Sequence, residues 1–110
     1  MHPRRGEVWW VTFDPSVGGE IQKTRPAIIL SNNAANTALN RVIVVPISSK
    51  TAKIYPAETL ITLNGEQRKA MADQIMAASK QRLRSRLGSL SSGDMTKLEN
   101  VVLMQLAIGR

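Results

Sequence analysis

Short hydrophobic stretches, some alternating and some continuous, run along most of the chain and predict a series of β-strands. The first, EVWWVTF, alternates and is rich in Val, Trp and Phe, which favour strands. The next two, PAIILS and RVIVVPIS, are almost wholly apolar, as buried strands are. Asn64-Gly65, which is typical of a hairpin turn, separates the last two segments. The expected strands span residues 7–13, 26–31, 41–48, 57–63 and 68–75.

The hydrophobic spacing becomes helical near the C-terminus. Ser91 or Ser92 can cap a helix there, and Asp94 favours its first turn. The apolar residues that recur at helical spacing are Met95, Leu98, Val101, Val102 and Leu106. The last two turns are apolar on nearly every side, which favours burial against a second subunit as well as against the strands. Residues 32–40 are rich in turn formers and could hold one short helical turn.

Five or six short strands closed by one helix predict a mainly β fold of the α+β class, in the form of a small, strongly bent barrel. The chain has 110 residues, so we expect a single domain over residues 1–110. Its core would be modest, and a partner subunit would help to cover apolar surface.

The absence of cysteine from the sequence excludes a disulfide framework and a thiolate metal site, and it fits a reducing compartment. No apolar run approaches the roughly 18 residues that a membrane-spanning helix needs. Residues 1–5 lead into a strand-like segment rather than into the apolar part of a signal peptide. We therefore expect a soluble, unprocessed protein of the cytoplasm that makes no membrane contact.

The chain is strongly basic, with fifteen Lys and Arg against eight Asp and Glu and a net charge of +7. This balance attracts phosphate polyanions or acidic protein surfaces, although ordinary solvated surfaces also carry it. Part of the charge falls in KQRLRSRL, residues 80–87. If this segment is extended, Lys80, Arg82, Arg84 and Arg86 project from one face, with Leu83 and Leu87 toward the core. The four cations would then contact phosphates or protect an exposed sheet edge, and both interpretations remain open.

Arg25 stands at the point where a polar, glycine-containing loop enters the second strand. Because Pro26 follows it, its backbone is held extended, and its guanidinium projects from a fixed strand start. Arginine stays cationic and offers five donors, which suits a phosphoryl group. A salt bridge with Glu20 or Asp14 is the alternative that the segment itself does not exclude.

The third strand ends in two hydroxyl residues, Ser48 and Ser49, followed by Lys50. On its own this sequence is typical of a turn. If the strand neighbours the one that Arg25 begins, the hydroxyls and the guanidinium could converge at one rim of the barrel.

Several fragments of the chain match a known family in order and spacing: GEVWWVTFDPSVGGE, TRPAIILS, VVPISS, YP and ADQI. Through them the chain resembles the MazF/PemK-type toxins over nearly its full length, from about residue 5 to residue 109. The resemblance implies an SH3-like barrel of the CcdB/PemK-like class, a homodimer and the toxin of a type II toxin-antitoxin system. It further implies a metal-independent endoribonuclease that cuts single-stranded mRNA within a short base sequence. The expected inhibitor is a MazE-like antitoxin with an acidic, flexible C-terminal segment.

The resemblance also assigns roles to individual residues. Arg25 falls on the family's essential arginine, Ser48 on a position that is often threonine, and Glu20 on the acidic residue of the loop after the first strand. Asp73-Gln74 matches a polar pair near the RNA groove. Serine lacks the methyl group that stiffens threonine, and Lys23-Thr24 replaces a stretch that commonly contains glycine.

We expect Arg25 to bind the scissile phosphate, Ser48 to donate a hydrogen bond to it and Glu20 to be a possible base, with no cofactor. The RNA itself supplies the 2′-hydroxyl nucleophile, which leaves 5′-hydroxyl and 2′,3′-cyclic or 3′-phosphate ends. His2 is the sole histidine and lies at a chain end, so a two-histidine mechanism is excluded, and the carboxylates show no close metal-ligand spacing. The residues expected to contact RNA are Lys23, Thr24, Ser49, Lys50, Lys53, Tyr55, Asp73, Gln74, Lys80, Arg82, Arg84 and Arg86.

Aromatic residues allow two interpretations. Trp9 and Trp10 are adjacent, so one ring should enter the core and the other should face outward. A subunit interface is the first interpretation of the outward ring, and a stacked base is the second. Tyr55 could pack or could stack on a base. Two alternatives to the nuclease remain: a CcdB-like toxin that poisons DNA gyrase by protein contact, and a basic module that binds single-stranded nucleic acid without cutting it.

Overall fold

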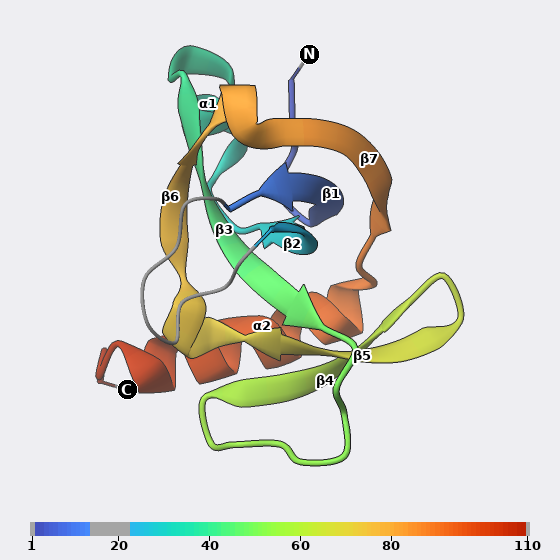
Figure 1. Ribbon diagram of the computed structural model, residues 1–110. Coiled ribbons are helices and arrows are strands. Elements are labelled where there is room, and N and C mark those ends of the chain that lie inside the picture. The colour runs from blue at the N-terminus through green and yellow to red at the C-terminus, as the bar shows by residue number, and fades with distance from the viewer. Residues whose placement is uncertain (1, 14–22, 110) are drawn as a thin grey trace.

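The computed structural model describes residues 2–13 and 23–109, where seven strands form one curled sheet with a C-terminal helix beneath it (Figure 1). The strands are β1 (Glu7–Thr12), β2 (Thr24–Ile29), β3 (Arg41–Ser48), β4 (Glu58–Leu63), β5 (Glu66–Met71), β6 (Met76–Ser79) and β7 (Leu83–Ser89). The helices are α1 (Asn33–Ala38) and α2 (Ser92–Gln105), and two 3-10 turns are η1 (Ala72–Gln74) and η2 (Lys80–Arg82). The mainly β architecture with a C-terminal helix is confirmed.

The sheet has the strand order β4-β5-β3-β2-β1-β7, and β6 pairs with β3 beside this path. All of these pairings are antiparallel. Strand β3 pairs with β6 over residues 41–44, with β2 over residues 44–46 and with β5 through its last two residues. One long strand therefore connects the β1–β2 side of the sheet to the β4–β5 hairpin.

Strands β2 and β3 are buried on both faces. The neighbours Ile28 and Ile29 belong to different core clusters, and so do Val44 and Val45. The cluster of Ile28 and Val45 includes Leu98 from α2, whereas the other cluster lies on the opposite face of the sheet. Two-sided burial explains why these strands read as continuous apolar runs rather than as an alternating pattern.

Helix α2 begins as the sequence predicts. Ser91 is the N-cap, and its Oγ accepts a hydrogen bond of 3.1 Å from the backbone N–H of Asp94. The helix ends at Gln105, before the expected apolar residues are complete, and Ala107 follows with a left-handed φ of 57°. Neither helix in the ranges 2–13 and 23–109 is long and apolar enough to cross a lipid bilayer.

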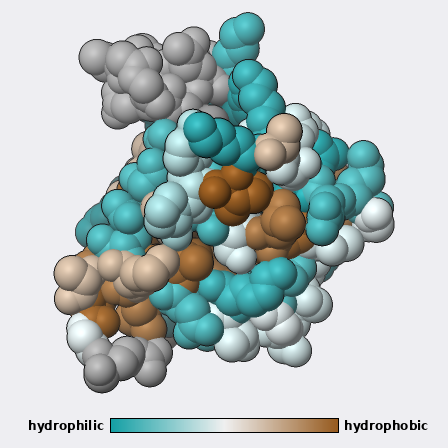
Figure 2. Space-filling view, turned by 90° about the horizontal axis from the view of Figure 1, so that it is seen from below, coloured by the Kyte–Doolittle hydropathy of each residue, from teal (hydrophilic) through white to brown (hydrophobic). Residues whose placement is uncertain are grey.

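The C-terminal end of α2 leaves hydrophobic side chains in the open. Met104, Leu106 and Ile108 are 59%, 49% and 53% exposed. Figure 2, viewed from the side of α2, shows hydrophobic residues gathered near this end of the chain. These three side chains are therefore not buried against the sheet, and the expected contact of this end of the helix with a second subunit stays a prediction.

Two segments differ from the pattern expected of them. The strand predicted over residues 68–75 ends at Met71, and η1 then turns the chain into β6, which the sequence analysis did not predict. The segment 80–87 is not one strand, because its first three residues form η2, where Ser79 Oγ accepts from the Gln81 N–H at 3.2 Å. The expected row of Lys80, Arg82, Arg84 and Arg86 along one strand is therefore wrong.

A buried ion pair fixes the β3–β4 connection to the β4–β5 hairpin. Lys69 Nζ lies 2.9 Å from Glu58 Oε1, and the two side chains are only 9% and 8% exposed. Lys69 Nζ also donates to the carbonyl of Lys53 at 3.1 Å, while the Tyr55 N–H donates to Glu58 Oε1 at 2.9 Å. Both charges thus have several partners, as buried charges require.

Replacing Lys69 by Met should lower the free energy of unfolding by about 3 kcal/mol, because the Glu58 carboxylate would stay buried without its cation. Urea denaturation measures the loss. Lys97→Met is the matched control, since Lys97 is 52% exposed and its 3.5 Å pair with Asp94 should contribute at most about 0.5 kcal/mol. Equal losses in the two variants would contradict the structural importance of the buried pair.

Candidate functional site

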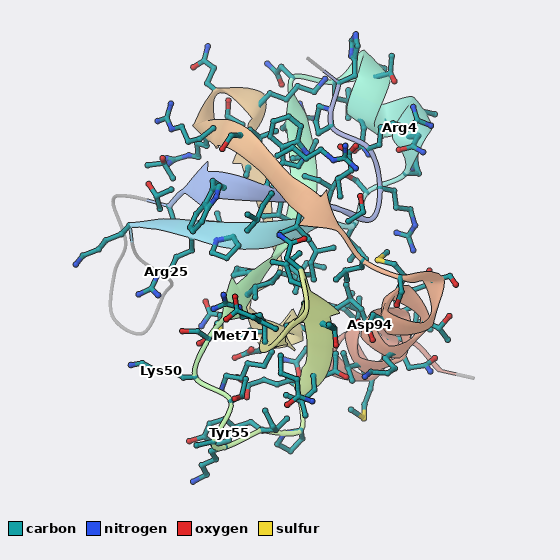
Figure 3. All side chains as sticks on the ribbon, turned by 90° about the vertical axis from the view of Figure 1, so that its right-hand side faces the viewer. Arg4, Arg25, Lys50, Tyr55, Met71 and Asp94 are labelled. Carbon is teal, nitrogen blue, oxygen red and sulfur yellow. The ribbon has the colours of Figure 1, made fainter. Side chains whose placement is uncertain are left out.

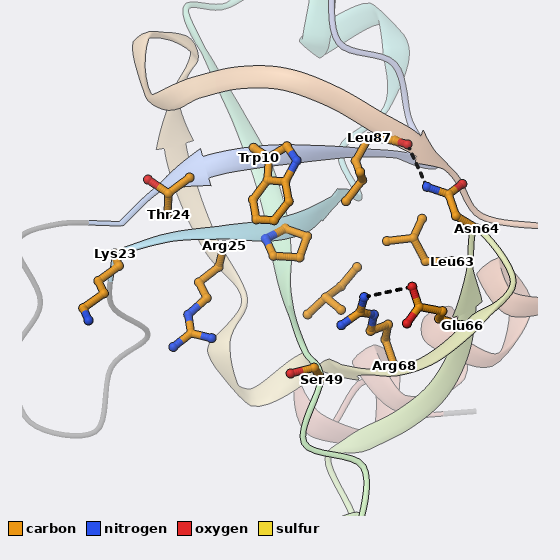
Figure 4. A pocket seen from close by; sticks show the side chains of 12 residues that line it. Trp10, Lys23, Thr24, Arg25, Ser49, Leu63, Asn64, Glu66, Arg68 and Leu87 are labelled. Atoms are coloured by element: carbon orange, nitrogen blue, oxygen red, sulfur yellow. Dashed lines mark hydrogen bonds and ion pairs between the residues drawn. The ribbon is translucent and has the colours of Figure 1, made fainter.

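A cavity of about 340 Å³ opens between the β1–β2 strands and the β4–β5 hairpin (Figure 4). Trp10 and residues 23–26 contribute one part of its lining, and Leu63, Asn64, Glu66 and Arg68 contribute another. The end of β3 adds Ile47 and Ser49. The cavity therefore combines two arginines with an apolar surface that includes an indole ring.

Arg25 reaches this cavity from the beginning of β2. Its backbone pairs with Val11 of β1, and its side chain is exposed and points into the space between the strands and the hairpin (Figure 4). Two residues before Arg25, Lys23 has a left-handed φ of 61°, and its carbonyl accepts from the Phe13 N–H at 2.8 Å. Glycine adopts such a φ without steric cost, so the position suits the glycine-containing stretch that Lys23-Thr24 replaces.

Strand β2 pairs with β3 as far as Ala27 with Pro46, and the last two residues of β3, Ile47 and Ser48, pair with β5. Ile47 and Ser49 line the same cavity as Arg25, so the end of β3 and the beginning of β2 share one rim. Ser49 lines the cavity, whereas Ser48 is half-buried, and its Oγ accepts from the Lys50 N–H at 3.1 Å. The hydrogen bond fixes the Ser48 oxygen and leaves its O–H proton available to a ligand.

The two tryptophans separate as adjacent strand residues should. Trp9 is 8% exposed and belongs to the core, whereas Trp10 is 36% exposed and lines the cavity. Arg68 also lines it, and neither Arg68 nor Trp10 was among the residues expected to contact RNA. Sequence periodicity could not find Arg68, because only the pairing of β5 with β3 brings the hairpin to this rim.

The β3–β4 connection carries exposed cations and Tyr55 below the cavity. Lys53 Nζ lies 5.0 Å from the centroid of the Tyr55 ring, and Lys69 Nζ lies 5.5 Å from it, both within the range of cation–π contacts. Arg25 and Lys50 project on the same side of the molecule (Figure 3). Tyr55 is 52% exposed, so its ring could accept a stacked base.

The cations of residues 80–86 bind mainly to β1. Arg82 Nη1 donates to the Thr12 carbonyl at 3.0 Å, and Arg84 Nε donates to Thr12 Oγ1 at 2.9 Å. Arg86 Nε lies 3.3 Å from Glu7 Oε2, and Lys80 is half-buried in η2. These contacts fasten β7 to β1, whatever further contact the arginines make.

The remaining expected residues lie elsewhere or outside the described ranges. Asp73 is exposed and Gln74 half-buried in η1, and neither lines the cavity. Glu20 and Asp14 lie outside the described residues. Within residues 2–13 and 23–109, no three His, Asp or Glu side chains gather closely enough to hold a metal ion.

The fold and the cavity define a small, basic half-barrel with a site suited to an anionic ligand at its rim. The family model described as "PemK-like, MazF-like toxin of type II toxin-antitoxin system" matches residues 4–106. The chain is 37% identical over 112 residues to endoribonuclease MazF9 of Mycobacterium tuberculosis, covering 94% of this chain and 95% of that protein. The chain therefore belongs to the PemK-like, MazF-like toxin family.

Solved structures agree with this fold. A crystal structure of MazF from Deinococcus radiodurans superposes with a TM-score of 0.86 at 22% identity, covering 98% of this chain and 99% of the other. An endoribonuclease in complex with its cognate antitoxin, from a mycobacterial species, gives a TM-score of 0.83 at 23% identity and covers 98% of each chain. The expected SH3-like, CcdB/PemK-like class is confirmed, with seven strands in the described residues rather than five or six.

Proposed function

We propose that this protein is the toxin of a type II toxin-antitoxin system and acts as an endoribonuclease on single-stranded mRNA, within a short base sequence. Its family and its 37% identity to an endoribonuclease over nearly the whole chain support this function. The observation that carries the proposal is Arg25, which stands at a fixed strand start and points into a cavity beside Ser49.

The RNA supplies its own nucleophile in this reaction. The 2′-oxygen attacks the adjacent phosphorus and loses its proton to a base, for which Glu20 is the proposed residue. The bond from phosphorus to the 5′-oxygen then breaks, and the leaving oxygen takes up a proton. The products are a 2′,3′-cyclic phosphate, which water can open to a 3′-phosphate, and a 5′-hydroxyl. The protein needs no metal for these steps, because Arg25 supplies the positive charge that the phosphorane requires.

Ser48 is proposed to donate its hydroxyl proton to a phosphoryl oxygen. The Lys50 N–H holds its oxygen, so the side chain is oriented without the methyl group that threonine would bring. Ser49 is the nearest competitor for this role, because it lines the cavity directly. The two serines are adjacent on the strand end, and their variants can separate them.

The RNA path is proposed to follow the exposed cations and aromatic rings of this face. Lys23 and Thr24 line the cavity, and Lys50, Lys53 and Tyr55 continue the surface along the β3–β4 connection. Asp73, Gln74, Lys80, Arg82, Arg84 and Arg86 remain proposed contacts. A single strand could stack bases on exposed rings while cations bind its phosphates.

The partners follow from family and charge. A cognate antitoxin with an acidic flexible segment would be attracted to a chain of net charge +7 and would compete with RNA for this face. The exposed apolar end of α2 is suited to a second subunit of a homodimer. We propose a cytoplasmic protein, where mRNA and antitoxin are present.

Arg25→Ala should reduce single-turnover cleavage of a long mixed-sequence RNA by about 10²-fold or more, because one charge-assisted donor to the phosphorane is lost. Arg25→Lys should recover only part of the rate, since lysine lacks the planar fork. Arg41→Ala removes an equal charge outside the cavity and should leave the rate nearly unchanged. Full activity in a folded Arg25→Ala protein would refute the assignment of Arg25. If the wild-type protein does not cleave RNA, a gyrase supercoiling assay tests the gyrase-poisoning alternative, and RNA binding without cleavage supports the binding module.

Ser48→Ala should slow single-turnover cleavage by at least about tenfold, a smaller loss than for Arg25→Ala because a neutral donor is removed. Ser48→Thr keeps the hydroxyl and should retain most of the rate. Ser49→Ala serves as the comparison. If Ser49→Ala is the slower enzyme, the hydroxyl role belongs to Ser49.

Cleavage should be unchanged by an excess of EDTA over all divalent ions in the assay, because no step uses a metal-bound nucleophile. Gel analysis should show the same products with 5′-hydroxyl ends. Activity abolished by EDTA and restored by Mg²⁺ would contradict the mechanism.

A further inference from the structure

Arg68 is a second arginine in the cavity, and it reaches it from the hairpin rather than from β2. Its guanidinium is turned toward the same space as that of Arg25 (Figure 4). Its side chain is 30% exposed. Arg68 follows the Asn64-Gly65 turn by three residues, on the strand that pairs with the end of β3.

The Nε of Arg68 is the one buried side-chain nitrogen or oxygen in residues 2–13 and 23–109 without a hydrogen-bond partner. On the same guanidinium, Nη2 lies 3.6 Å from Glu66 Oε1, longer than a hydrogen bond. Glu66 is 72% exposed, so its carboxylate can turn to solvent. The edge formed by Nε and Nη2 is therefore a charged fork that the described part of the protein leaves largely unmatched.

A purely structural role does not account for this arrangement. A solvent-exposed ion pair contributes little to stability, and less than an unmade buried hydrogen bond costs. Lys69, the next residue on the strand, shows what a structural cation looks like here, with two short polar contacts on the other side of the hairpin. Arg68 has the opposite character, because its side chain lines the cavity and its buried Nε has no hydrogen-bond partner.

We propose that Arg68 binds a second phosphate of the RNA backbone, next to the scissile phosphate that Arg25 holds. The inference rests on the proposed function. A phosphate oxygen would accept from Nη2 in place of Glu66, and a second oxygen would accept from Nε, which is buried in the free protein and is reached only when the Glu66 carboxylate turns away. Trp10, Pro26, Ile47 and Leu87 give the rest of the cavity an apolar lining, which suits the sugar and base between two phosphates. Glu66 then competes with the phosphate, because its carboxylate pairs weakly with Arg68 Nη2 in the free protein.

The test measures binding without cleavage. The probe is a short, random-sequence pool of fluorescent 2′-O-methyl RNA, which lacks the nucleophile, and anisotropy titrations are run over a series of salt concentrations. Arg68→Gln should weaken binding by about tenfold and reduce the slope of log K against log salt by about 0.7, the value for one phosphate contact on a single strand. Arg68→Lys should keep the slope but lose part of the affinity. Arg41→Gln, which removes an exposed arginine outside the cavity, should change neither by a comparable amount.

Glu66→Gln provides a second test with the opposite sign. Binding should tighten by about twofold to fivefold, because the competing carboxylate is gone. The gain should disappear when Arg68→Gln is already present. Urea unfolding midpoints of all variants show whether any loss comes from the fold instead.

Several results would overturn the proposal. The first is an unchanged RNA affinity and salt slope in Arg68→Gln. The second is an equal gain in affinity from Glu66→Gln whether or not Arg68 is present. The third is a wild-type protein that does not bind the RNA pool. Parallel incubation with unmodified RNA separates this inference from the proposed function. Cleavage with an unchanged Arg68→Gln slope refutes only the Arg68 contact, whereas binding with a reduced slope but no cleavage refutes only the nuclease.

Discussion

Backbone pairing along β3 joins the two parts of the sheet. This strand pairs with β2, β5 and β6 along eight residues, and its side chains enter core clusters on both faces of the sheet. Because both faces of β3 are closely packed, a slip of one residue would put side chains of the wrong shape into both clusters, and the packing therefore favours one register. The same register delivers Ser48 and Ser49 to the rim where β2 begins. The position of the cavity is therefore a consequence of core packing.

The basic residues divide into those that hold the fold and those that face ligand space. Arg5 donates to the Leu30 carbonyl and to Glu99, and Lys69 lies in the buried pair with Glu58. Arg82 and Arg84 fasten β7 to Thr12 of β1. Fewer cations than the net charge of +7 suggests would therefore contact a phosphate polyanion directly. The whole net charge still attracts such a polyanion from a distance. The arginines that line the cavity, Arg25 and Arg68, are few enough for each to be given a distinct role.

The β3–β4 connection shows how an interior pair can support an exposed surface. Tyr55 presents its ring to solvent, but its backbone N–H is held by Glu58, which Lys69 neutralises. An aromatic ring on an unsupported loop would lose conformational entropy when a base stacked on it. Here the fold has already restricted that loop. The buried charges therefore support the ligand face from inside, and Lys69 Nζ lies 5.5 Å from the centroid of the Tyr55 ring itself.

Most of the strands, the capped C-terminal helix, the rigid setting of Arg25 and the family could be predicted from the sequence, because periodicity, the Arg-Pro step and the ordered motifs are local properties. The sequence did not predict β6, the 3-10 turn at residues 80–82 or the partners of the arginines in β7, since these depend on which strand each segment meets. For the same reason Arg68 was missed, and Trp10 was not among the expected RNA contacts, although a base was one alternative for the outward-facing tryptophan. Their neighbours in sequence are ordinary strand residues, and only the bend of β3 from β2 to β5 brings an indole from β1 and a guanidinium from the hairpin into one cavity with Arg25.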